Sequence, residues 1–128
     1  MCYFAGQSSQ QGYILNRLEK LVDTEDIAWT PHGYKHFAST GLPWSEVVHT
    51  TTRGPAKYLP NTDVEALERL VWSQGTPTSN GRPWKVMEFR EVIGASAGRE
   101  SRWVRVEESG NTIHGHPIPQ EQYERLIG

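Results

Sequence analysis

The sequence has a single cysteine, Cys2, so no disulfide can form within the chain. A disulfide-stapled framework and a cysteine-based zinc knuckle are therefore excluded, and we expect a reducing compartment. Apolar runs of the roughly 18 residues that a membrane-spanning helix needs are also lacking. The N-terminus has no basic stretch followed by an apolar core, which would mark a signal peptide. We expect a soluble chain with no membrane partner.

An excess of positive charge is lacking as well. Thirteen Lys and Arg stand against fifteen Asp and Glu, which gives a net charge of −2 at pH 7. The chain therefore lacks the global basic field of many nucleic-acid binders, so any such role must rest on a local patch. What the chain does contain is aromatic mass for a core, with five Trp, five Tyr and three Phe among its 128 residues. This length predicts a single domain over residues 1–128.

The first half of the chain, about 11–75, is predicted to be helical. Apolar residues recur at helical spacing over 11–23, and a proline opens a short helical stretch over 43–49. Thr62 and Glu65 have the spacing of a capping box, and the apolar stripe that follows them stops before Gly75. We expect a helix there too.

The second half is predicted to form a sheet over about 84–118. The expected strands cover 84–93, 102–108 and 111–118, with turns at 94–98 and 109–111. The stretch 119–127, which begins with a proline, is expected to add a terminal helical turn or two. The predicted fold is therefore α+β, with N-terminal helices followed by a three- to four-stranded antiparallel meander.

Strand alternation gathers ionisable side chains on one face of this sheet. A two-residue turn at 110–111 sets the register that brings them together. The residues on this polar face are Glu107 opposite His114, Arg105 opposite His116, and Glu88 and Arg90 on the neighbouring strand. Such a face is either the solvated side of a half-buried sheet, or a site in which arginine holds a phosphate while a carboxylate and an imidazole exchange protons. The second alternative suits RNA cleavage by the ribose 2′-hydroxyl, without metal or cofactor.

Other residues could also contact RNA. The loop 50–58 combines hydroxyls, a glycine and the cations Arg53 and Lys57, so it is either a phosphate-binding loop or an exposed connection. Trp44, Trp72 and Trp84 are most simply packing residues, whereas an exposed Trp103 on the polar face could stack on a base. The spacings of His32 with His36, and of His114 with His116, are ones that zinc sites use. We expect His32 and His36 to be unrelated surface histidines instead.

The pattern from about 11 to 118 resembles the barnase, colicin D and RelE-like superfamily of small ribonucleases, which includes C-terminal toxin modules of bacterial polymorphic and contact-dependent systems. Helices are followed by a meander with Glu, Arg and His on successive strands. The segment 34–38, Tyr-Lys-His-Phe-Ala, followed by Gly41 and Glu46, is similar to the Lys-His element of toxin members. The resemblance implies these roles: His36 or Glu88 as general base, His114 as general acid, and Lys35, Arg90 and Arg105 as phosphate ligands. The family pattern does not account for His116, which we expect to contact the substrate from the same face.

The resemblance also implies partners and a place of action. The substrate would be RNA, with tRNA among the candidates, and a cognate immunity or antitoxin protein would bind the chain. The site of action would be cytoplasmic, after delivery as part of a secreted toxin. The alternative from another class is a non-catalytic binding module, such as an immunity or adaptor protein, for which ordinary ion pairs on the sheet face would suffice.

Overall fold

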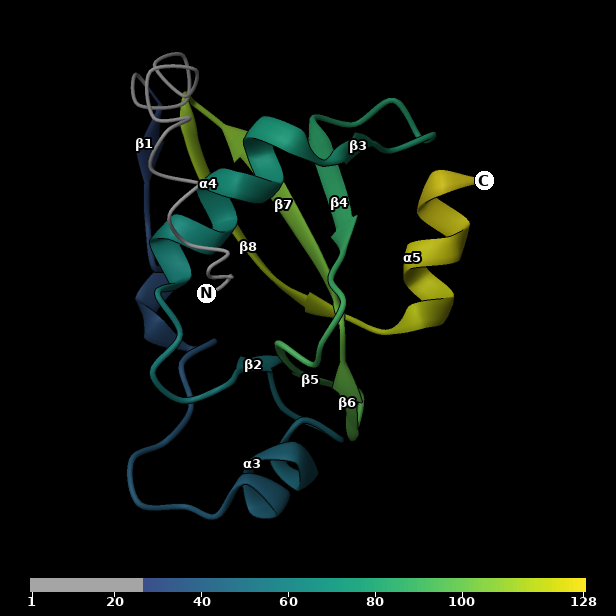
Figure 1. Cartoon of the computed structure of the whole chain (residues 1–128). Coiled ribbons are helices and arrows are strands. Elements are labelled where there is room, and N and C mark those ends of the chain that lie inside the picture. The colour runs from purple at the N-terminus through teal and green to yellow at the C-terminus, as the bar shows by residue number, and fades with distance from the viewer. Residues whose placement is uncertain (1–26) are drawn as a thin grey trace.

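A five-stranded sheet forms the centre of the computed structural model, which describes residues 27–128 (Figure 1). Its strand order is β1-β8-β7-β4-β3, and neighbouring strands are antiparallel except β1 with β8. The strand bounds, in sheet order, are Ala28–Trp29, Thr112–Ile118, Trp103–Ser109, Trp84–Glu88 and Thr76–Pro77. The helix expected over 11–23 lies outside the described residues.

A second sheet has three strands in the order β2-β5-β6. Its strands are β2 (Lys57–Tyr58), β5 (Gly94–Ser96) and β6 (Arg99–Ser101). The predicted strand over 84–93 is too long, because β4 ends at Glu88. The predicted turn over 94–98 is wrong in extent, because the chain turns only at 97–98, between β5 and β6.

Strand β5 consists of the small residues Gly94, Ala95 and Ser96, a composition that in the sequence predicts a turn. A side chain at Gly94 would collide with the carbonyl oxygen of Lys57 and lie 2.8 Å from Cγ of Pro117. Gly94 and Ala95 are both buried. Glycine in a strand often marks such a close approach of another backbone, which strand propensity does not reveal.

Three α-helices and one 3-10 turn complete the described chain. Their bounds are His32–Tyr34 for the 3-10 turn η2, Trp44–Thr50 for α3, Val64–Gln74 for α4 and Gln120–Ile127 for α5. The helices expected over 43–49 and 119–127 are confirmed, and each begins one residue after its proline. Within residues 27–128, none of the helices has the length and apolar character that crossing a bilayer requires.

The helix expected after Thr62 is confirmed as α4, but its cap is not the predicted one. The side chain of Asp63 is the cap, and it accepts a hydrogen bond from the amide of Ala66 at 3.1 Å. The hydroxyl of Thr62 instead donates to the carbonyl oxygen of Leu59, at 2.7 Å. Aspartate caps a helix as well as threonine does, so the sequence alone does not show which of two adjacent residues, Thr62 or Asp63, is the N-cap.

The fold is α+β, as predicted, but its order differs from the expected one. Strands β4, β7 and β8 form the antiparallel core of the meander, while the hairpin β5–β6 leaves it to join the second sheet. The parallel strand β1 and the short β3 extend the main sheet to five strands. A helix, α5, also follows the sheet (Figure 1).

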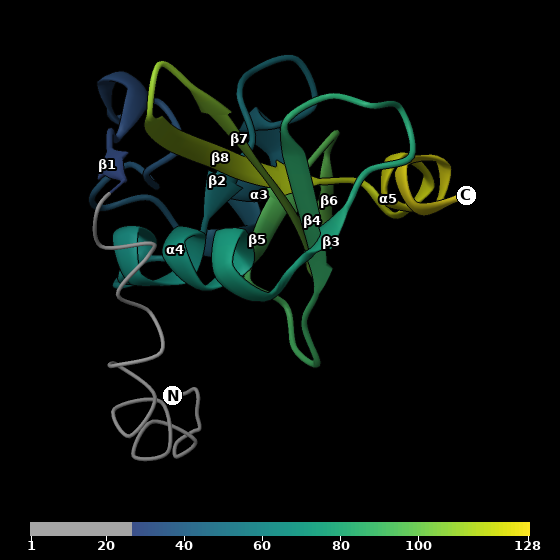
Figure 2. The same ribbon diagram turned by 90° about the horizontal axis from the view of Figure 1, so that it is seen from above.

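The two helices α4 and α5 pack on opposite faces of the main sheet (Figure 2). Val71 of α4 lies in a buried cluster with Val104 and Val106, which share one face of β7. Leu126 of α5 lies in a second cluster with Val86, which is on the other face. The face that the sequence predicts to be polar is therefore partly covered by α5 at the end of Glu88 and Trp103, while Arg105, Glu107, His114 and His116 lie towards its other end.

The register predicted for β7 and β8 is confirmed. Glu107 lies opposite His114, and Arg105 lies opposite His116. The turn at 110–111 has positive φ at both residues, 58° and 65°, which is the conformation that matches the twist of the strands it joins. The turn thus fixes which side chains of the two strands share a face.

We predict that Gly115→Ala lowers the melting temperature by roughly 5 to 15 °C, as expected for overpacking a filled core. A Cβ at this position in β8 would collide with the carbonyl oxygen of Arg105 and lie 2.7 Å from Cγ2 of Val106. The matched control is Gly110→Asn, because position 110 has open space and asparagine tolerates positive φ. Thermal unfolding followed by circular dichroism measures both, and equal melting temperatures would contradict the close approach.

Candidate functional site

Four of the five histidines come together beside the open end of the polar face. His32 stacks on His114, with ring centroids 4.3 Å apart and planes 16° apart. His36 stacks on His116, at 5.0 Å and 28°. The rings of His32 and His36 are 6.4 Å apart. We call these four residues the histidine cluster, and the fifth, His49, lies outside it in α3.

Two local structures aim these rings at one another. In β8, His114 and His116 are two residues apart and so point to the same face. In the segment before α3, three successive residues from His32 to Tyr34 have positive φ, at 54°, 74° and 64°. Only the middle one is glycine, so the other two adopt a conformation that costs on the order of 1 to 2 kcal/mol each. This turn carries His32 and His36 over the strand.

An arginine and a carboxylate of β7 border the cluster. Nη2 of Arg105 donates to Oε1 of Glu107 at 2.7 Å and lies 3.4 Å from Nε2 of His116. Oε2 of Glu107 lies 3.6 Å from Nε2 of His114. The guanidinium also lies 3.9 Å from the ring centroid of Trp84. The guanidinium of Arg105 therefore lies over an aromatic ring, and its Nη2 is directed at the cluster.

Burial keeps two of the four rings neutral. It lowers the pKa of both His36 and His116 to about 4. Nδ1 of His36 lies 2.7 Å from the carbonyl oxygen of Ala56, and Nδ1 of His116 lies 2.8 Å from that of Pro117. A carbonyl oxygen can only accept, so each Nδ1 carries the hydrogen and each Nε2 keeps its lone pair. At neutral pH both rings are therefore uncharged and keep a lone pair at Nε2, and the lone pair of His116 faces Nη2 of Arg105.

His114 differs from those two in its neighbour. Burial lowers its pKa as well, but the carboxylate of Glu107 acts in the opposite direction and favours the charged ring. The cation of Lys35 lies close enough to lower the pKa of His36, His114 and His116. The cluster thus combines a proton acceptor, a ring that a carboxylate helps to charge, and an exposed ammonium group.

Five of the predicted site residues meet in or beside the cluster: Lys35, His36, Arg105, His114 and His116. Lys57 lies next to them, but its ammonium group donates to the carbonyl oxygens of Lys35 at 2.7 Å and Phe37 at 3.3 Å. Lys57 therefore braces the backbone on both sides of His36.

Glu88 and Trp103 lie at the other end of the polar face. The carboxylate of Glu88 is paired with Arg102 at 2.8 Å, and the strand register places it opposite Trp103 rather than a histidine. The ring of Trp103 is half-buried and packs beside Tyr123 of α5, with centroids 6.4 Å apart. The expectation of an exposed Trp103 is wrong, because α5 covers it.

The remaining predicted cations lie away from the cluster. Arg90 is exposed in the bend that follows β4, since strand alternation ends at Glu88. Arg53 is exposed in the turn that follows α3. Neither contributes to the arrangement of rings described above.

The expectation that His32 and His36 are unrelated is wrong, since both join the cluster. Their spacing of four residues was the one signal in the sequence. Among residues 27–128, no three His, Cys, Asp or Glu side chains converge as metal ligands. The rings instead stack face to face, which directs their in-plane lone pairs away from a common centre.

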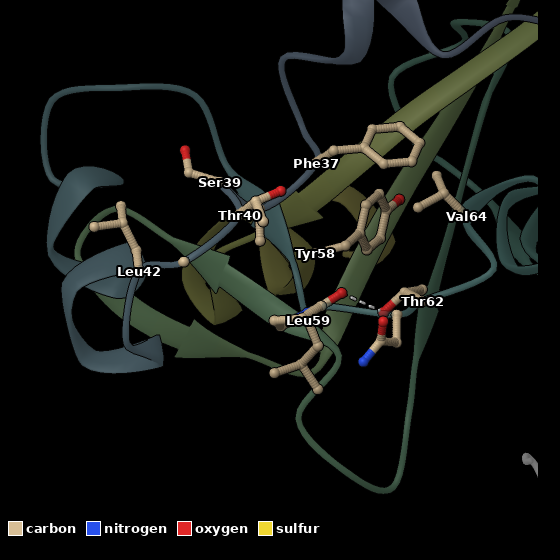
Figure 3. A pocket seen from close by; sticks show the side chains of 12 residues that line it. Phe37, Ser39, Thr40, Leu42, Tyr58, Leu59, Thr62 and Val64 are labelled. Carbon is tan, nitrogen blue, oxygen red and sulfur yellow. Dashed lines mark hydrogen bonds between the residues drawn. The ribbon is translucent and has the colours of Figure 1, made fainter.

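A pocket of about 320 Å³ lies between the segments 37–42 and 58–64 (Figure 3). Phe37, Tyr58 and Val64 line one side of it and Leu42 the other, and the hydroxyl of Thr62 donates to Leu59 at its rim. Its lining includes no Asp, Glu, His, Lys or Arg. The pocket therefore supplies no general acid or base near neutral pH, unlike the histidine cluster.

Comparisons of the chain with protein-family models, with curated proteins and with solved structures found no match. What the site can do chemically follows from its own groups. Imidazoles can accept and donate protons, while Lys35 and Arg105 can offset the charge of an anion.

We predict that the folded protein loses stability as pH falls from about 6.5 to 4. The unfolded chain binds protons at His36 and His116 near pH 6.5, whereas the folded chain does so only near pH 4, so acid favours unfolding across this window. His36→Gln and His116→Gln should each flatten the fall in melting temperature. His49→Gln, an exposed control, should follow the parent. Parallel curves for all four proteins would contradict the buried neutral rings.

Proposed function

We propose that this protein is a metal-independent endoribonuclease of bacterial toxin type, which cleaves RNA by attack of the ribose 2′-hydroxyl. The observation that carries the proposal is the histidine cluster itself, in which two stacked pairs from distant segments meet beside Arg105 and Lys35. Strained backbone at His32 and Tyr34 supports it, because such strain concentrates at functional sites. The resemblance to small ribonucleases of toxin systems leads to the same reaction.

In this reaction His36 is the general base. Its neutral Nε2 takes the proton of the 2′-hydroxyl, and the 2′-oxygen then attacks the adjacent phosphorus. Glu88 is the weaker candidate for this role, because it is paired with Arg102 outside the cluster. The base needs no activation at neutral pH, since burial already keeps the ring uncharged.

His114 is the general acid. Its protonated ring gives a proton to the 5′-oxygen as the bond between phosphorus and that oxygen breaks, which leaves a 2′,3′-cyclic phosphate and a 5′-hydroxyl. Glu107, at 3.6 Å, favours the charged form that the step requires. Lys35 and Arg105 offset the charge that builds on the phosphate oxygens. The protons taken and given balance over one turnover.

The substrate would be RNA, with tRNA among the candidates, and a cognate immunity or antitoxin protein would bind the same chain. Action in the cytoplasm, after delivery as part of a secreted toxin, belongs to the same proposal. Expression provides a first test, because an active toxin arrests its host unless an inhibitor is supplied. A host that tolerates the chain would favour the non-catalytic binding module.

We predict that His36→Ala and His114→Ala each lower RNA cleavage on the order of 10² to 10⁴-fold, which is what positioned proton transfer contributes. Glu88→Gln should cleave at nearly the parent rate, and so should the control His49→Ala. Cleavage of a labelled oligoribonucleotide in excess chelator measures all four. Unchanged cleavage in His36→Ala together with a large loss in Glu88→Gln would move the base to Glu88, and no cleavage by the parent would overturn the proposal.

We also predict a bell-shaped dependence of kcat/KM on pH, with its maximum on the acidic side of neutrality. The rate should rise with pH near 4, where His36 loses its proton. As pH rises further, the rate should fall, because His114 loses the proton that it must donate. Its pKa is lowered by burial, so this fall should begin at a pH below 6.5. Single-turnover cleavage between pH 3.5 and 9 measures both limbs, and a maximum at alkaline pH would exclude this pair of groups.

A further inference from the structure

A buried carboxylate lies beneath the sheet, on the face opposite the histidine cluster. Helix α4, which packs across β7 and β8 (Figure 1), carries Glu68. Only 2% of the surface of Glu68 is exposed. Position 68 falls on the apolar stripe of that helix, four residues after Val64 and three before Val71. A charge-bearing side chain on such a stripe needs hydrogen-bond partners, because leaving it unpaired is costly.

Three polar groups surround this carboxylate. Nε1 of Trp29 donates to Oε1 at 2.8 Å, and the hydroxyl of Tyr58 donates to Oε2 at 2.7 Å. The backbone amide of Gly115 also lies near the carboxylate. Burial raises the pKa of Glu68, while these three groups act in the opposite direction and favour the ionised form. The three groups come from β1, β2 and β8.

Each of the three groups is linked to part of the histidine cluster, either along the chain or through a backbone hydrogen bond. Gly115 lies between His114 and His116, and Trp29 precedes His32 by three residues. Tyr58 follows Lys57, and its amide donates to the carbonyl oxygen of His36 at 2.9 Å. One carboxylate is therefore linked to both segments that carry the four rings, directly near His32 and on β8, and through Tyr58 to His36.

The topology leaves part of β8 next to this carboxylate. Strand β1 has two residues, and its pairing with β8 ends where the amide of Thr30 donates to Ile113. Beyond that point no strand of the described chain pairs with this edge of β8. In this stretch of β8 the backbone amide of Gly115 has the carboxylate of Glu68 as a neighbour.

We propose that Glu68 is a positioning residue of the histidine cluster: its carboxylate holds β1, β2 and β8 so that the rings of His32 and His36 stack on those of His114 and His116. The catalytic part of this inference rests on the proposed function. The geometric part does not, because ring stacking can be observed in a protein that cleaves nothing.

The test compares Glu68→Gln with Glu65→Gln, an exposed acid of the same helix that pairs with Arg69. Glutamine keeps the shape but has one acceptor oxygen, so at least one donor loses its partner. We expect Glu68→Gln to move the ring proton resonances of the histidines and to weaken the contacts between stacked rings in nuclear magnetic resonance spectra. We expect kcat for RNA to fall on the order of 10 to 100-fold with little change in KM, as for displaced catalytic groups.

Tyr58→Phe, which removes one donor and keeps the carboxylate, guards against a variant that does not fold, and it should give a smaller change of the same kind. Glu65→Gln should match the parent in spectra and kinetics. Unchanged histidine resonances in both Glu68→Gln and Tyr58→Phe, with only a lower melting temperature, would overturn the inference. If the two variants show altered ring contacts but the parent protein does not cleave RNA, the positioning role is upheld and the proposed function is rejected.

Discussion

The register of β7 and β8 is the constraint on which the rest of this structure depends. A two-residue turn at 110–111 sets it, with both residues in the left-handed region. A shift of one residue would turn His114 and His116 to the face that packs against α4, and no cluster could form. The same register puts Gly115 against the β7 backbone, where its lack of a side chain lets the two strands approach.

Burial and local charge compete within the cluster, and burial lowers the pKa of three of its rings, His36, His114 and His116. The carbonyl oxygens that hold Nδ1 of His36 and His116 raise the pKa of each ring, yet desolvation outweighs them. At His114 the negative charge of Glu107 raises the pKa of the ring and so opposes the effect of burial. Different surroundings thus give identical imidazoles different tendencies to hold a proton, which is how a site obtains an acid and a base from one residue type. A chain of net charge −2 can still present a local cationic site here, because Lys35 and Arg105 lie at the cluster.

Packing of the polar face limits where chemistry can occur. Helix α5 covers the end that carries Trp103, and the hairpin β5–β6 leaves the main sheet before β7 begins. Glu88 therefore faces a covered tryptophan and an arginine instead of the histidines. The segment from His32 to Tyr34 covers the opposite end with strained backbone. A continuous polar face expected from strand alternation is reduced in this way to one compact cluster.

The sequence by itself determined the features that depend on near neighbours. The hairpin register, the helices α3, α4 and α5, and the shared face of Arg105, Glu107, His114 and His116 follow from turn residues and from periods of two or 3.6 residues. Tertiary structure alone decided which distant segments meet: that His32 and His36 stack on β8, that α5 covers Trp103, and that Gly94–Ser96 pairs with β2. Glu68 shows the boundary between the two. Its place on an apolar stripe was visible in the sequence, but the three groups around its carboxylate come from strands separated from it by 10 to 47 residues, and only packing brings them together.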